Sequence, residues 1–323
     1  MSGRRATPKA SVVIAAFNAA HTLGDQLEAL SRQEVDFAWE VLVCDNGSTD
    51  ATARVASEWQ GRLPGLRVLD ASRRRGPGAA RNVGAAAAGS PLLLFCDADD
   101  VVADDWLREL RSALLLEEFV TGNSRRPELN SRPDAPVYFD FSTYRMHVLP
   151  QLPAAGAGNL GIRAEVFAEV GGFDESLLTG EDLDLCWRVQ LAGHRLAVHR
   201  AAVVTVSNRA GLGASFRQAY AYGVGDRRLR HKYARVIRAL EGVTPLPVAT
   251  DAAATTPAAA ASRPSLLQRV LRKVASIRRP SDLTQLSHRI GTALGYRWGS
   301  IDRSLPQLEP PPSLPRALSG AGS

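Results

Sequence analysis

Cysteines are scarce in this sequence of 323 residues, and they are not arranged as metal ligands. The three cysteines are Cys44, Cys96 and Cys186, and each stands in an apolar or helical context. Because none of them has a partner at the spacing of a metal site, we expect small buried side chains in a reducing compartment. The cysteines therefore point to packing and not to metal binding.

Long apolar runs are also missing. No stretch of about 18 apolar residues is present, so we expect no transmembrane helix. The basic segment MSGRRATPKA at the N-terminus is not followed by an apolar segment, so we expect no signal peptide either. These absences predict a soluble protein of the cytoplasm. They leave open a peripheral contact with the inner face of the membrane.

The chain does contain an ordinary hydrophobic fraction and an excess of basic residues. The hydrophobic fraction is 45%, as in other globular proteins, and the length allows one large or two modest domains. The net charge of +6 comes from arginine, mainly in the second half of the chain. It favours attraction to phosphates, nucleic acid or an anionic membrane surface, and it does not choose among them.

Short apolar strands alternate with helices through the first hundred residues. The strands are predicted at residues 11–17, 40–44, 66–69 and 92–95, and the helices between them at 21–32, 51–59 and 81–88. This alternation is typical of βαβ units with right-handed crossovers. We therefore predict an α/β domain with a doubly wound, mostly parallel central sheet flanked by helices.

An acidic cluster follows the strand at residues 92–95. Asp97, Asp99 and Asp100 stand at its carboxyl end, where open α/β sheets bind their ligands. Mg²⁺ or Mn²⁺ prefers such oxygen ligands, and a cation held by one or two carboxylates can still bind a diphosphate. The alternative is an acidic turn that caps a helix beginning near Asp104.

Two further segments are candidates for ligand contact. Asp45 opens the segment DNGSTD directly after a strand, which suits either a ligand-binding edge or a well-made strand-to-helix turn. A basic loop runs from Arg73 to Asn82, and most of its arginines are expected to be solvated. Arg81 is predicted to lie just before the next helix, where its side chain can turn inward toward a diphosphate.

The middle of the chain adds a polar segment and an acidic helix. Residues 121–136 are rich in Arg, Asn and Pro and predict a flexible loop. Glu181, Asp184 and Arg188 fall on neighbouring helical positions, which predicts an ion-pair ladder that adds a few tenths of a kcal/mol per pair. Asp182 stands at the start of the same helix but faces another direction from these three residues. Capping the helix is its simplest role.

Six segments in order resemble the family 2 inverting glycosyltransferases. They are VVIAAFN, VLVCDNGSTD, ARNVGAAAAG, LLFCDADD, GNLGIRAEVFAEVGGFDE and GEDLDLCWRVQLAG, and the resemblance extends from about Ser11 to Tyr222. It implies the GT-A fold, an α/β domain that binds a nucleotide-sugar. It also implies an enzyme that moves a sugar from a nucleotide-sugar donor to a hydroxyl of a glycan or lipid-linked acceptor.

The resemblance assigns donor-binding residues one by one. Ala15, Phe17 and Asn18 match the first-strand segment that contacts the nucleoside, and Asp45 matches a carboxylate that reads the base. Asn46 belongs to the same donor-binding set, but many relatives have a second aspartate at its position. The nucleobase therefore cannot be assigned from this pair.

The resemblance also assigns the metal ligands and the catalytic pair. Arg81 matches a basic residue near the nucleotide, and Asp97 and Asp99 match the D-x-D pair that holds Mg²⁺ or Mn²⁺ on the donor diphosphate. Asp182 matches the general base, and Glu181 matches a residue that places the acceptor or supports the base. One base without an enzyme nucleophile implies a single displacement with inversion.

One departure from the family pattern concerns the metal site. Relatives often carry a histidine after the last strand of the domain, but the corresponding residues 201–208 contain none. His194 and His199 precede this segment and are predicted to be surface or turn residues. The cation would then be held mainly by carboxylates and phosphates.

Two other functions compete with this interpretation. A sugar nucleotidyltransferase would show a glycine-rich basic signature near the first strand, and VVIAAFNAAHTL lacks one. A non-catalytic module that binds nucleotide-sugars would have lost its catalytic residues, but Asp97, Asp99, Glu181 and Asp182 are intact. No nucleic acid partner is expected.

The composition and the family resemblance together predict five regions along the chain. They are a flexible N-terminus at 1–10, a GT-A domain at 11–242, a Pro/Ala/Thr-rich linker at 243–264, a basic helical extension at 265–305 and a disordered tail at 306–323. Within the extension, short helices are predicted at 265–277 and 283–294. The basic C-terminal helices are the candidate for peripheral membrane contact.

Overall fold

The structure is a computed structural model that describes residues 7–125, 142–206, 212–241, 280–300 and 305–312. The chain is divided between two units. Of the described residues, the first unit holds 7–125, 142–206, 232–241 and 307–312, and the second holds 212–231, 280–300 and 305–306.

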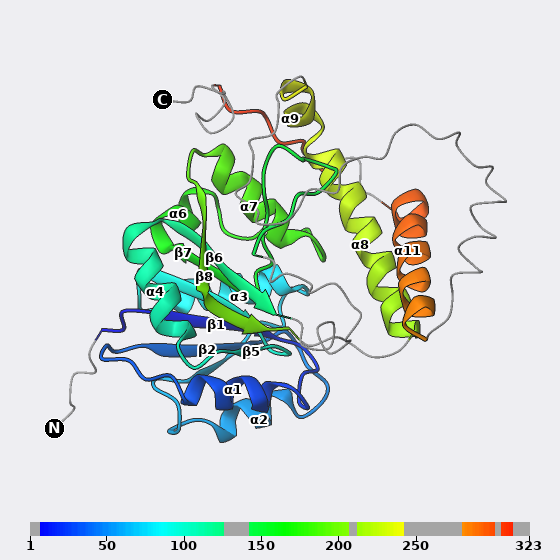
Figure 1. The fold of residues 1–323 in the computed structure, drawn as a ribbon. Coiled ribbons are helices and arrows are strands. Elements are labelled where there is room, and N and C mark those ends of the chain that lie inside the picture. Colours follow the sequence, from blue (N-terminus) through cyan, green and yellow to red (C-terminus); the bar gives the residue numbers. More distant parts are fainter. Residues whose placement is uncertain (1–6, 126–141, 207–211, 242–279, 301–304, 313–323) are drawn as a thin grey trace, which may run out of the picture. The chain divides into compact units, whose positions relative to one another are not determined.

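The first unit is built on a mixed eight-stranded sheet (Figure 1). Its strands in chain order are β1 (Ser11–Ala16), β2 (Glu40–Asp45), β3 (Arg67–Asp70), β4 (Leu92–Asp97), β5 (Val101–Val102), β6 (Phe119–Arg125), β7 (Asn159–Arg163) and β8 (Leu196–Thr205). Their order across the sheet is β3-β2-β1-β4-β7-β6-β8-β5. The first four are parallel, β7 is antiparallel to β4 and β6, β8 is parallel to β6, and β5 is antiparallel to β8.

Helices cover both faces of this sheet. The described helices of the first unit are α1 (Leu23–Ser31), α2 (Thr52–Glu58), α3 (Pro77–Ala87), α4 (Trp106–Leu116), α6 (Ala164–Glu169), α7 (Glu181–Leu191) and α9 (Ala234–Ala239). Val12 and Ile14 of β1 pack with α1, α2 and α4. Val13 faces the opposite way, toward α3. This two-sided burial confirms the predicted doubly wound α/β fold.

Helix α3 begins earlier than the sequence predicts. The prediction was residues 81–88, but the helix runs from Pro77 to Ala87, so Arg81 lies inside it and not in the preceding loop. Pro77 occupies the first turn, where a missing N–H costs nothing. At Gly84 an added Cβ would overlap Val13, so only glycine allows α3 to approach the sheet this closely.

The predicted loop at residues 121–136 is wrong over its first part. Residues 121–125 complete β6, and the remainder lies outside the described residues. The polar residues in this part of β6 can be buried because they have hydrogen-bond partners. Thr121 Oγ1 donates to the carbonyl of Asn159 at 3.1 Å, and Asn159 Nδ2 donates to the carbonyl of Asn123 at 3.0 Å. Satisfied hydrogen bonds allow a strand without an apolar pattern.

The cysteines are buried and free, as expected. Cys44 and Cys96 lie on β2 and β4, and Cys186 lies on α7. Burial raises the pKa of the Cys44 thiol to about 12. These thiols are therefore packing groups and not nucleophiles.

The second unit contains most of α8 (Leu212–Lys232) and all of α11 (Pro280–Trp298). The helix predicted at 283–294 corresponds to α11, and the helix predicted at 265–277 lies outside the described residues. The two helices touch through glycines: a Cβ at Gly223 would overlap Thr292, and one at Gly295 would overlap Tyr220. Both helices therefore approach each other backbone to backbone.

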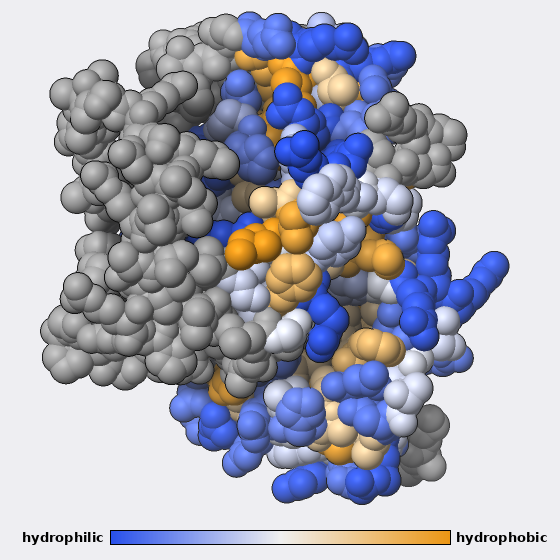
Figure 2. All heavy atoms as spheres, turned by 90° about the vertical axis from the view of Figure 1, so that its right-hand side faces the viewer, coloured by the Kyte–Doolittle hydropathy of each residue, from blue (hydrophilic) through white to orange (hydrophobic). Residues whose placement is uncertain are grey.

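No helix among the described residues is long and apolar enough to cross a membrane. Figure 2 shows one face of the molecule, where apolar side chains form small groups among hydrophilic ones. Exposed large apolar residues include Leu116, Leu178 and Trp298. Scattered residues of this kind are normal on protein surfaces.

The five predicted regions remain predictions. The linker at 243–264 and most of the tail lie outside the described residues. Within the predicted N-terminal and tail regions, the N–H of Lys9 donates to Ala38 at 2.6 Å and that of Leu308 donates to Lys232 at 2.7 Å. The division into units groups residues 212–231 with α11, whereas the sequence grouped them with the GT-A domain.

Candidate functional site

The predicted ligand-binding residues gather where β1, β2 and β4 end. In the sheet register Ala15 lies opposite Asp97, and Ala16 lies opposite Asp45. Asp45 is the last residue of β2 and Asp97 the last of β4, with β1 between them. Two strand spacings separate their backbones by about 10 Å. Asp99 follows in the turn after β4.

The turns after β1 and β2 are joined by side-chain hydrogen bonds. Asn18 has a positive φ of 49°, its N–H donates to Ser48 Oγ at 2.9 Å, and its Oδ1 accepts from the N–H of Thr49 at 2.8 Å. Asp45 Oδ1 accepts from the N–H of Ser48 at 3.1 Å, as in a strand-to-helix turn. Phe17 remains 51% exposed beside them. The DNGSTD segment thus makes a well-formed turn that leaves an aromatic ring available to a ligand.

Asn46 is committed to the backbone of the basic loop. Its Nδ2 donates to the carbonyls of Ala71 at 2.7 Å and Arg74 at 2.8 Å, and its Oδ1 accepts from the N–H of Gly76 at 2.8 Å. The side chain is buried. In this structure Asn46 therefore shapes the loop that leads into α3, and direct donor contact remains a prediction for it.

Arg81 joins the acidic strand end to the acidic helix. Its NH2 group lies 2.6 Å from Asp97 Oδ1, and its NH1 group lies 2.9 Å from Glu181 Oε1. Burial alone would lower the pKa of Arg81, but the charges of Asp97 and Glu181 raise it above its ordinary value. The guanidinium is therefore a permanent positive charge inside an acidic site.

Glu181 and Asp182 open α7. Burial, and then the neighbouring charge of Asp182, raise the pKa of Glu181. Burial also raises the pKa of Asp182, whose Oδ1 accepts the N–H of Leu183 at 2.8 Å. Both carboxylates are thus held where a proton binds more readily than on an exposed side chain, which suits proton transfer.

A glycine-containing segment lies between Asp97 and Asp182. A Cβ added to Gly156 would lie 3.8 Å from Asp182 Oδ2, and one added to Gly158 would lie 2.8 Å from Asp97 Oδ2 and 3.1 Å from Asp100 Oδ2. The carboxylates therefore face backbone that carries no side chain.

The chemistry of these residues suits a hard cation that also takes ligands from elsewhere. Asp97 is 35% exposed in its side chain and offers oxygen to a ligand. Among the described residues, no group of three or more His, Cys, Asp or Glu side chains is arranged to hold a metal ion. Mg²⁺ commonly binds one or two carboxylates together with phosphates and water, so Asp97 and Asp99 fit that type of site.

The two histidines near the last strand have other partners. His194 Nδ1 lies 2.6 Å from Glu118 and its Nε2 lies 3.0 Å from Glu169. His199 Nε2 lies 2.9 Å from Glu109. His199 was predicted to be a surface or turn residue, but it stands on β8, which runs from Leu196 to Thr205. Both ring nitrogens of His194 are occupied, so it is not a metal ligand here.

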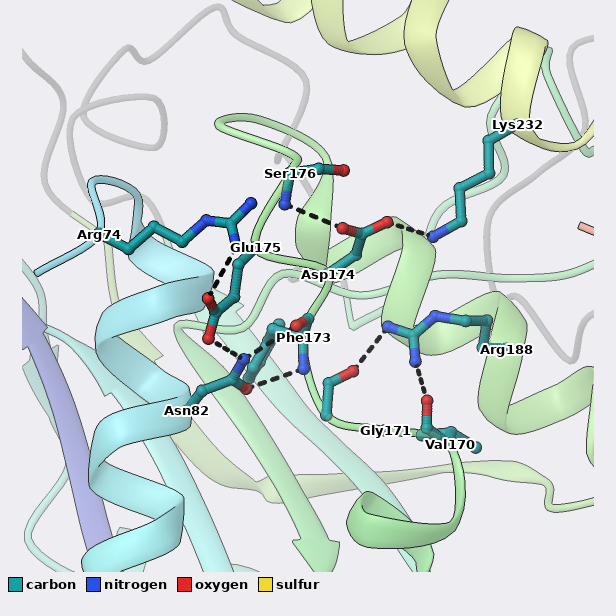
Figure 3. Close-up of a pocket in the computed structure, with 11 residues that line it drawn as sticks. Arg74, Asn82, Val170, Gly171, Phe173, Asp174, Glu175, Ser176, Arg188 and Lys232 are labelled. Atoms are coloured by element: carbon teal, nitrogen blue, oxygen red, sulfur yellow. Dashed lines mark hydrogen bonds and ion pairs between the residues drawn. The ribbon is translucent and has the colours of Figure 1, made fainter. Parts of the chain in front are cut away.

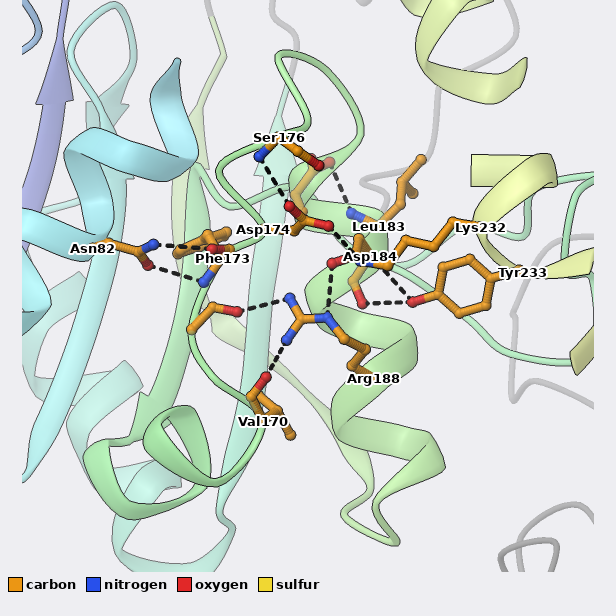
Figure 4. Close-up of polar contacts among 12 residues, drawn as sticks. Asn82, Val170, Phe173, Asp174, Ser176, Leu183, Asp184, Arg188, Lys232 and Tyr233 are labelled. Carbon is orange, nitrogen blue, oxygen red and sulfur yellow. Dashed lines mark hydrogen bonds and ion pairs between the residues drawn. The ribbon is translucent and has the colours of Figure 1, made fainter. Parts of the chain in front are cut away.

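The ion-pair ladder predicted on α7 is only partly correct. Arg188 Nε pairs with Asp184 Oδ2 at 2.7 Å, but Glu181 pairs with Arg81. Asp184 is fully buried and also lies 2.6 Å from Lys232 Nζ and 2.9 Å from the hydroxyl of Tyr233 (Figure 4). The pair is therefore part of a buried network and not a surface ladder.

This network also fixes the turn before α7. Arg188 donates to the carbonyls of Val170 at 2.5 Å and Gly172 at 2.7 Å. Lys232 pairs with Asp174 at 2.6 Å. Burial alone would raise the pKa of Asp174, but its hydrogen bond from Lys232 and those from Ser176 hold the pKa at about 2. Lys232 and Tyr233 were not identified from the sequence.

A pocket of about 430 Å³ lies beside this turn (Figure 3). Its lining residues are Arg74, Asn82, Val170, Gly171, Gly172, Phe173, Asp174, Glu175, Ser176, Arg188 and Lys232. Neither Asp97 nor Asp182 lines it, so this pocket is distinct from the predicted metal and base residues. It shares a wall with the site, because the Arg81 guanidinium lies 5.4 Å from the centre of the Phe173 ring.

Part of this chain matches a known protein family and several known proteins. Residues 11–171 match the family model of glycosyl transferase family 2. Glycosyltransferase AglE of Haloferax volcanii is 30% identical over 193 residues, covering 58% of this chain and 64% of the relative. The succinoglycan biosynthesis protein ExoO of Rhizobium meliloti is 32% identical over 213 residues, covering 60% and 59%. The chain thus spans less than two thirds of each relative.

A solved structure shows the same fold. The mannosyltransferase PcManGT from Pyrobaculum calidifontis, in complex with GDP-Man and Mn²⁺, superposes with a TM-score of 0.60 at 19% identity, covering 92% of this chain and 89% of that one. The match confirms the predicted GT-A type of fold. The match to the family model, together with these relatives, places residues 11–171 in glycosyl transferase family 2.

Proposed function

We propose that this protein is an inverting glycosyltransferase. It would move a sugar from a nucleotide-sugar donor to a hydroxyl of a glycan or lipid-linked acceptor by a metal-assisted single displacement. Membership of family 2 and relatives named as glycosyltransferases support the reaction class. A relative named for succinoglycan biosynthesis supports a glycan acceptor. PcManGT was solved with GDP-Man and Mn²⁺, which supports a nucleotide-sugar and a divalent cation.

One observation carries the proposal. Arg81 contacts Asp97 and Glu181 together, and Asp182 follows Glu181 at the start of α7. The predicted donor side and the predicted base side therefore belong to one buried electrostatic cluster. A leaving diphosphate and an attacking alcohol need charged groups on opposite sides of the sugar, and this cluster has carboxylates from two different elements.

Asp182 acts as the general base in this proposal. Its carboxylate takes the proton of the acceptor hydroxyl as that oxygen bonds to the anomeric carbon. The bond from the anomeric carbon to the diphosphate oxygen breaks at the same time, and the nucleoside diphosphate leaves. Attack opposite the leaving group inverts the anomeric configuration. Glu181, held by Arg81, supports the position of the base.

The remaining predicted residues bind the donor. Phe17 offers an exposed ring to the nucleoside, next to Asn18 and Asp45. Asp97 and Asp99 would hold Mg²⁺ or Mn²⁺, which supplies positive charge to the departing diphosphate. We propose that the enzyme works in the cytoplasm and that its basic C-terminal helices contact the inner face of the membrane.

The test is donor turnover by the purified chain. UDP-, GDP- and dTDP-sugars are incubated with and without Mn²⁺, and release of nucleoside diphosphate is measured. We expect release from at least one donor, dependent on the cation and increased by an acceptor glycan. Release of pyrophosphate from a nucleoside triphosphate in the presence of a sugar phosphate would instead identify a nucleotidyltransferase. Binding without release from any donor would identify a binding module.

A further inference from the structure

Arg81 contacts both sides of the proposed site. NH2 is 2.6 Å from Asp97 on β4, and NH1 is 2.9 Å from Glu181 on α7. The Arg81 side chain is only 5% exposed. A guanidinium is planar and holds its donors at fixed spacing, so it can set the separation between two acceptors. Asp97 and Glu181 would otherwise repel each other in a buried setting.

Little of this guanidinium is exposed to a ligand in solvent, because the Arg81 side chain is 5% exposed and that of Asp97 is 35% exposed. Each terminal nitrogen already donates to a carboxylate, and the buried Nε has no hydrogen-bond partner among the described residues. The Phe173 ring lies against it, with the guanidinium carbon 5.4 Å from the ring centre. A nucleotide approaching from solvent therefore meets Asp97 before it meets Arg81.

The backbone that carries Arg81 is also tightly held. A Cβ on Gly78, one turn earlier in α3, would lie 3.2 Å from Glu181 Cγ and 3.1 Å from Phe173 Cβ. Helix α3 therefore packs closely against the start of α7. The guanidinium is anchored at both ends, by its backbone and by its two carboxylates.

We propose that Arg81 is a positioning residue that holds Asp97 and Glu181 at a fixed separation and thereby places Asp182 against the donor. This inference rests on the proposed function. It gives Arg81 a role different from the donor contact that the family resemblance implies. Arg81 acts through the two carboxylates and does not touch the substrate.

The test replaces Arg81 by lysine, which keeps the charge but cannot contact both carboxylates in a fixed geometry. We expect Arg81→Lys to lower kcat by about 100-fold, the loss typical of a misplacement of about 1 Å. We expect the KM for the donor to stay within threefold. The nucleoside diphosphate that the wild type releases should bind in EDTA with a Kd within threefold, measured by calorimetry.

Other outcomes would reject the positioning role of Arg81. If Arg81 binds the donor directly, Arg81→Lys will weaken cation-free nucleotide binding tenfold or more, and the positioning role is rejected. An unchanged kcat would reject it as well. If the wild type itself releases no nucleoside diphosphate, the proposed function fails. If the wild type turns over and Arg81→Lys behaves like it, only this inference fails.

A matched control separates positioning from general stability. Arg188 is another largely buried arginine that pairs with a carboxylate of α7, at 2.7 Å from Asp184. Arg188→Lys should lower Tm by an amount similar to that of Arg81→Lys while keeping kcat within threefold. Equal losses of kcat in both variants would reject the inference.

A double-variant cycle tests the route through Glu181. Glu181→Gln keeps an oxygen acceptor for Arg81 NH1 but removes the charge, and it should lower kcat without changing cation-free nucleotide binding. Both substitutions break the same contact between Arg81 and Glu181. The kcat of the double variant should therefore lie within threefold of the kcat of the less active single variant. Independent, multiplying losses would overturn the inference. If Arg81→Lys does not fold, an unchanged kcat in Glu181→Gln overturns it too.

Discussion

At the scale of single residues, the carboxylates of the site differ in their surroundings. Asp97 is partly exposed and has Arg81 as its counter-ion. Asp182 has no arginine within salt-bridge distance among the described residues, and burial raises its pKa. The two carboxylates therefore differ: Asp97 pairs with an arginine and is partly open to solvent, while the surroundings of Asp182 favour binding of a proton.

Replacing Asp182 by asparagine removes the proton acceptor and keeps the shape. We expect Asp182→Asn to lower kcat by about 100-fold to 10,000-fold, the usual contribution of a general base. Donor affinity should be unchanged, because the predicted donor contacts are elsewhere. Steady-state kinetics and nucleotide titration check both. A kcat within a few-fold of the wild type would show that another group takes the proton.

The same residue predicts the pH dependence of the wild-type enzyme. The base must be unprotonated, so kcat/KM should fall as the pH drops below the pKa of Asp182. Because burial raises that pKa, the fall should begin at a higher pH than for an ordinary aspartate, whose pKa is about 4.

Gly156 lies beside the carboxylate of Asp182, the proposed base. An added Cβ there would be 3.8 Å from Asp182 Oδ2, with no other atom within 4 Å. We expect Gly156→Val to fill this space and raise the KM for the acceptor tenfold or more, while donor hydrolysis in the absence of acceptor changes less than threefold. Gly24→Val is the control, since a Cβ there meets no atom within 4 Å and Gly24 lies on α1. Equal effects on donor hydrolysis and acceptor use would argue against an acceptor path beside Gly156.

At the scale of elements, the strands that carry the site could be predicted closely. The runs VVIAA, EVLVC and LLLF are continuous, apolar and short, so β1, β2 and β4 were placed to within two residues. Their order of alternation with helices also predicted that Asp45 and Asp97 end parallel strands at one edge. A strand that is buried on both faces is apolar along its whole length, so it can be recognised as a continuous apolar run in the sequence.

Helices and strands made of small or polar residues were harder to predict from the sequence. Helix α3 starts with Pro77, Gly78, Ala79 and Ala80, which have no large apolar side chain, so its start at Pro77 was missed. The end of β6 is polar, and only its partner Asn159 explains its burial. The pairing of Arg81 with Glu181 joins residues 100 positions apart, which no local pattern encodes.

Helix α7 is fixed by the buried network around Asp184, and this predicts a stability effect. Tyr233→Phe removes the hydroxyl that donates to Asp184 Oδ1 at 2.9 Å. We expect a loss of about 1–3 kcal/mol in the free energy of unfolding, because a buried acceptor loses a hydrogen bond. Urea denaturation measures this. Tyr220→Phe, at a residue 37% exposed, should change the stability by less than about 0.5 kcal/mol. Equal changes in the two variants would mean that the Tyr233 contact contributes little.

At the scale of the whole molecule, two units share one chain, and only the first contains the predicted site residues. Unfolding can therefore occur in more than one step. A ligand of the site should stabilise the transition of the first unit and leave the other unchanged. This separates a specific ligand effect from a general effect of salt or cation on the protein.

The separate unfolding of the first unit also allows the predicted cation site to be tested. A nucleoside diphosphate with Mn²⁺ at about 100 times its Kd should stabilise the first unit of the wild type by about 2.7 kcal/mol. Asp99→Ala should lose the Mn²⁺-dependent part of this gain, because one of the two predicted carboxylate ligands is gone. Asp104→Ala is the control, since its side chain is 73% exposed and pairs with Arg32 at the surface. Thermal melting with nucleotide alone, with Mn²⁺ alone and with both measures the difference. If Asp99→Ala keeps the full Mn²⁺-dependent gain, the cation is held by other groups and Asp99 is only part of the turn.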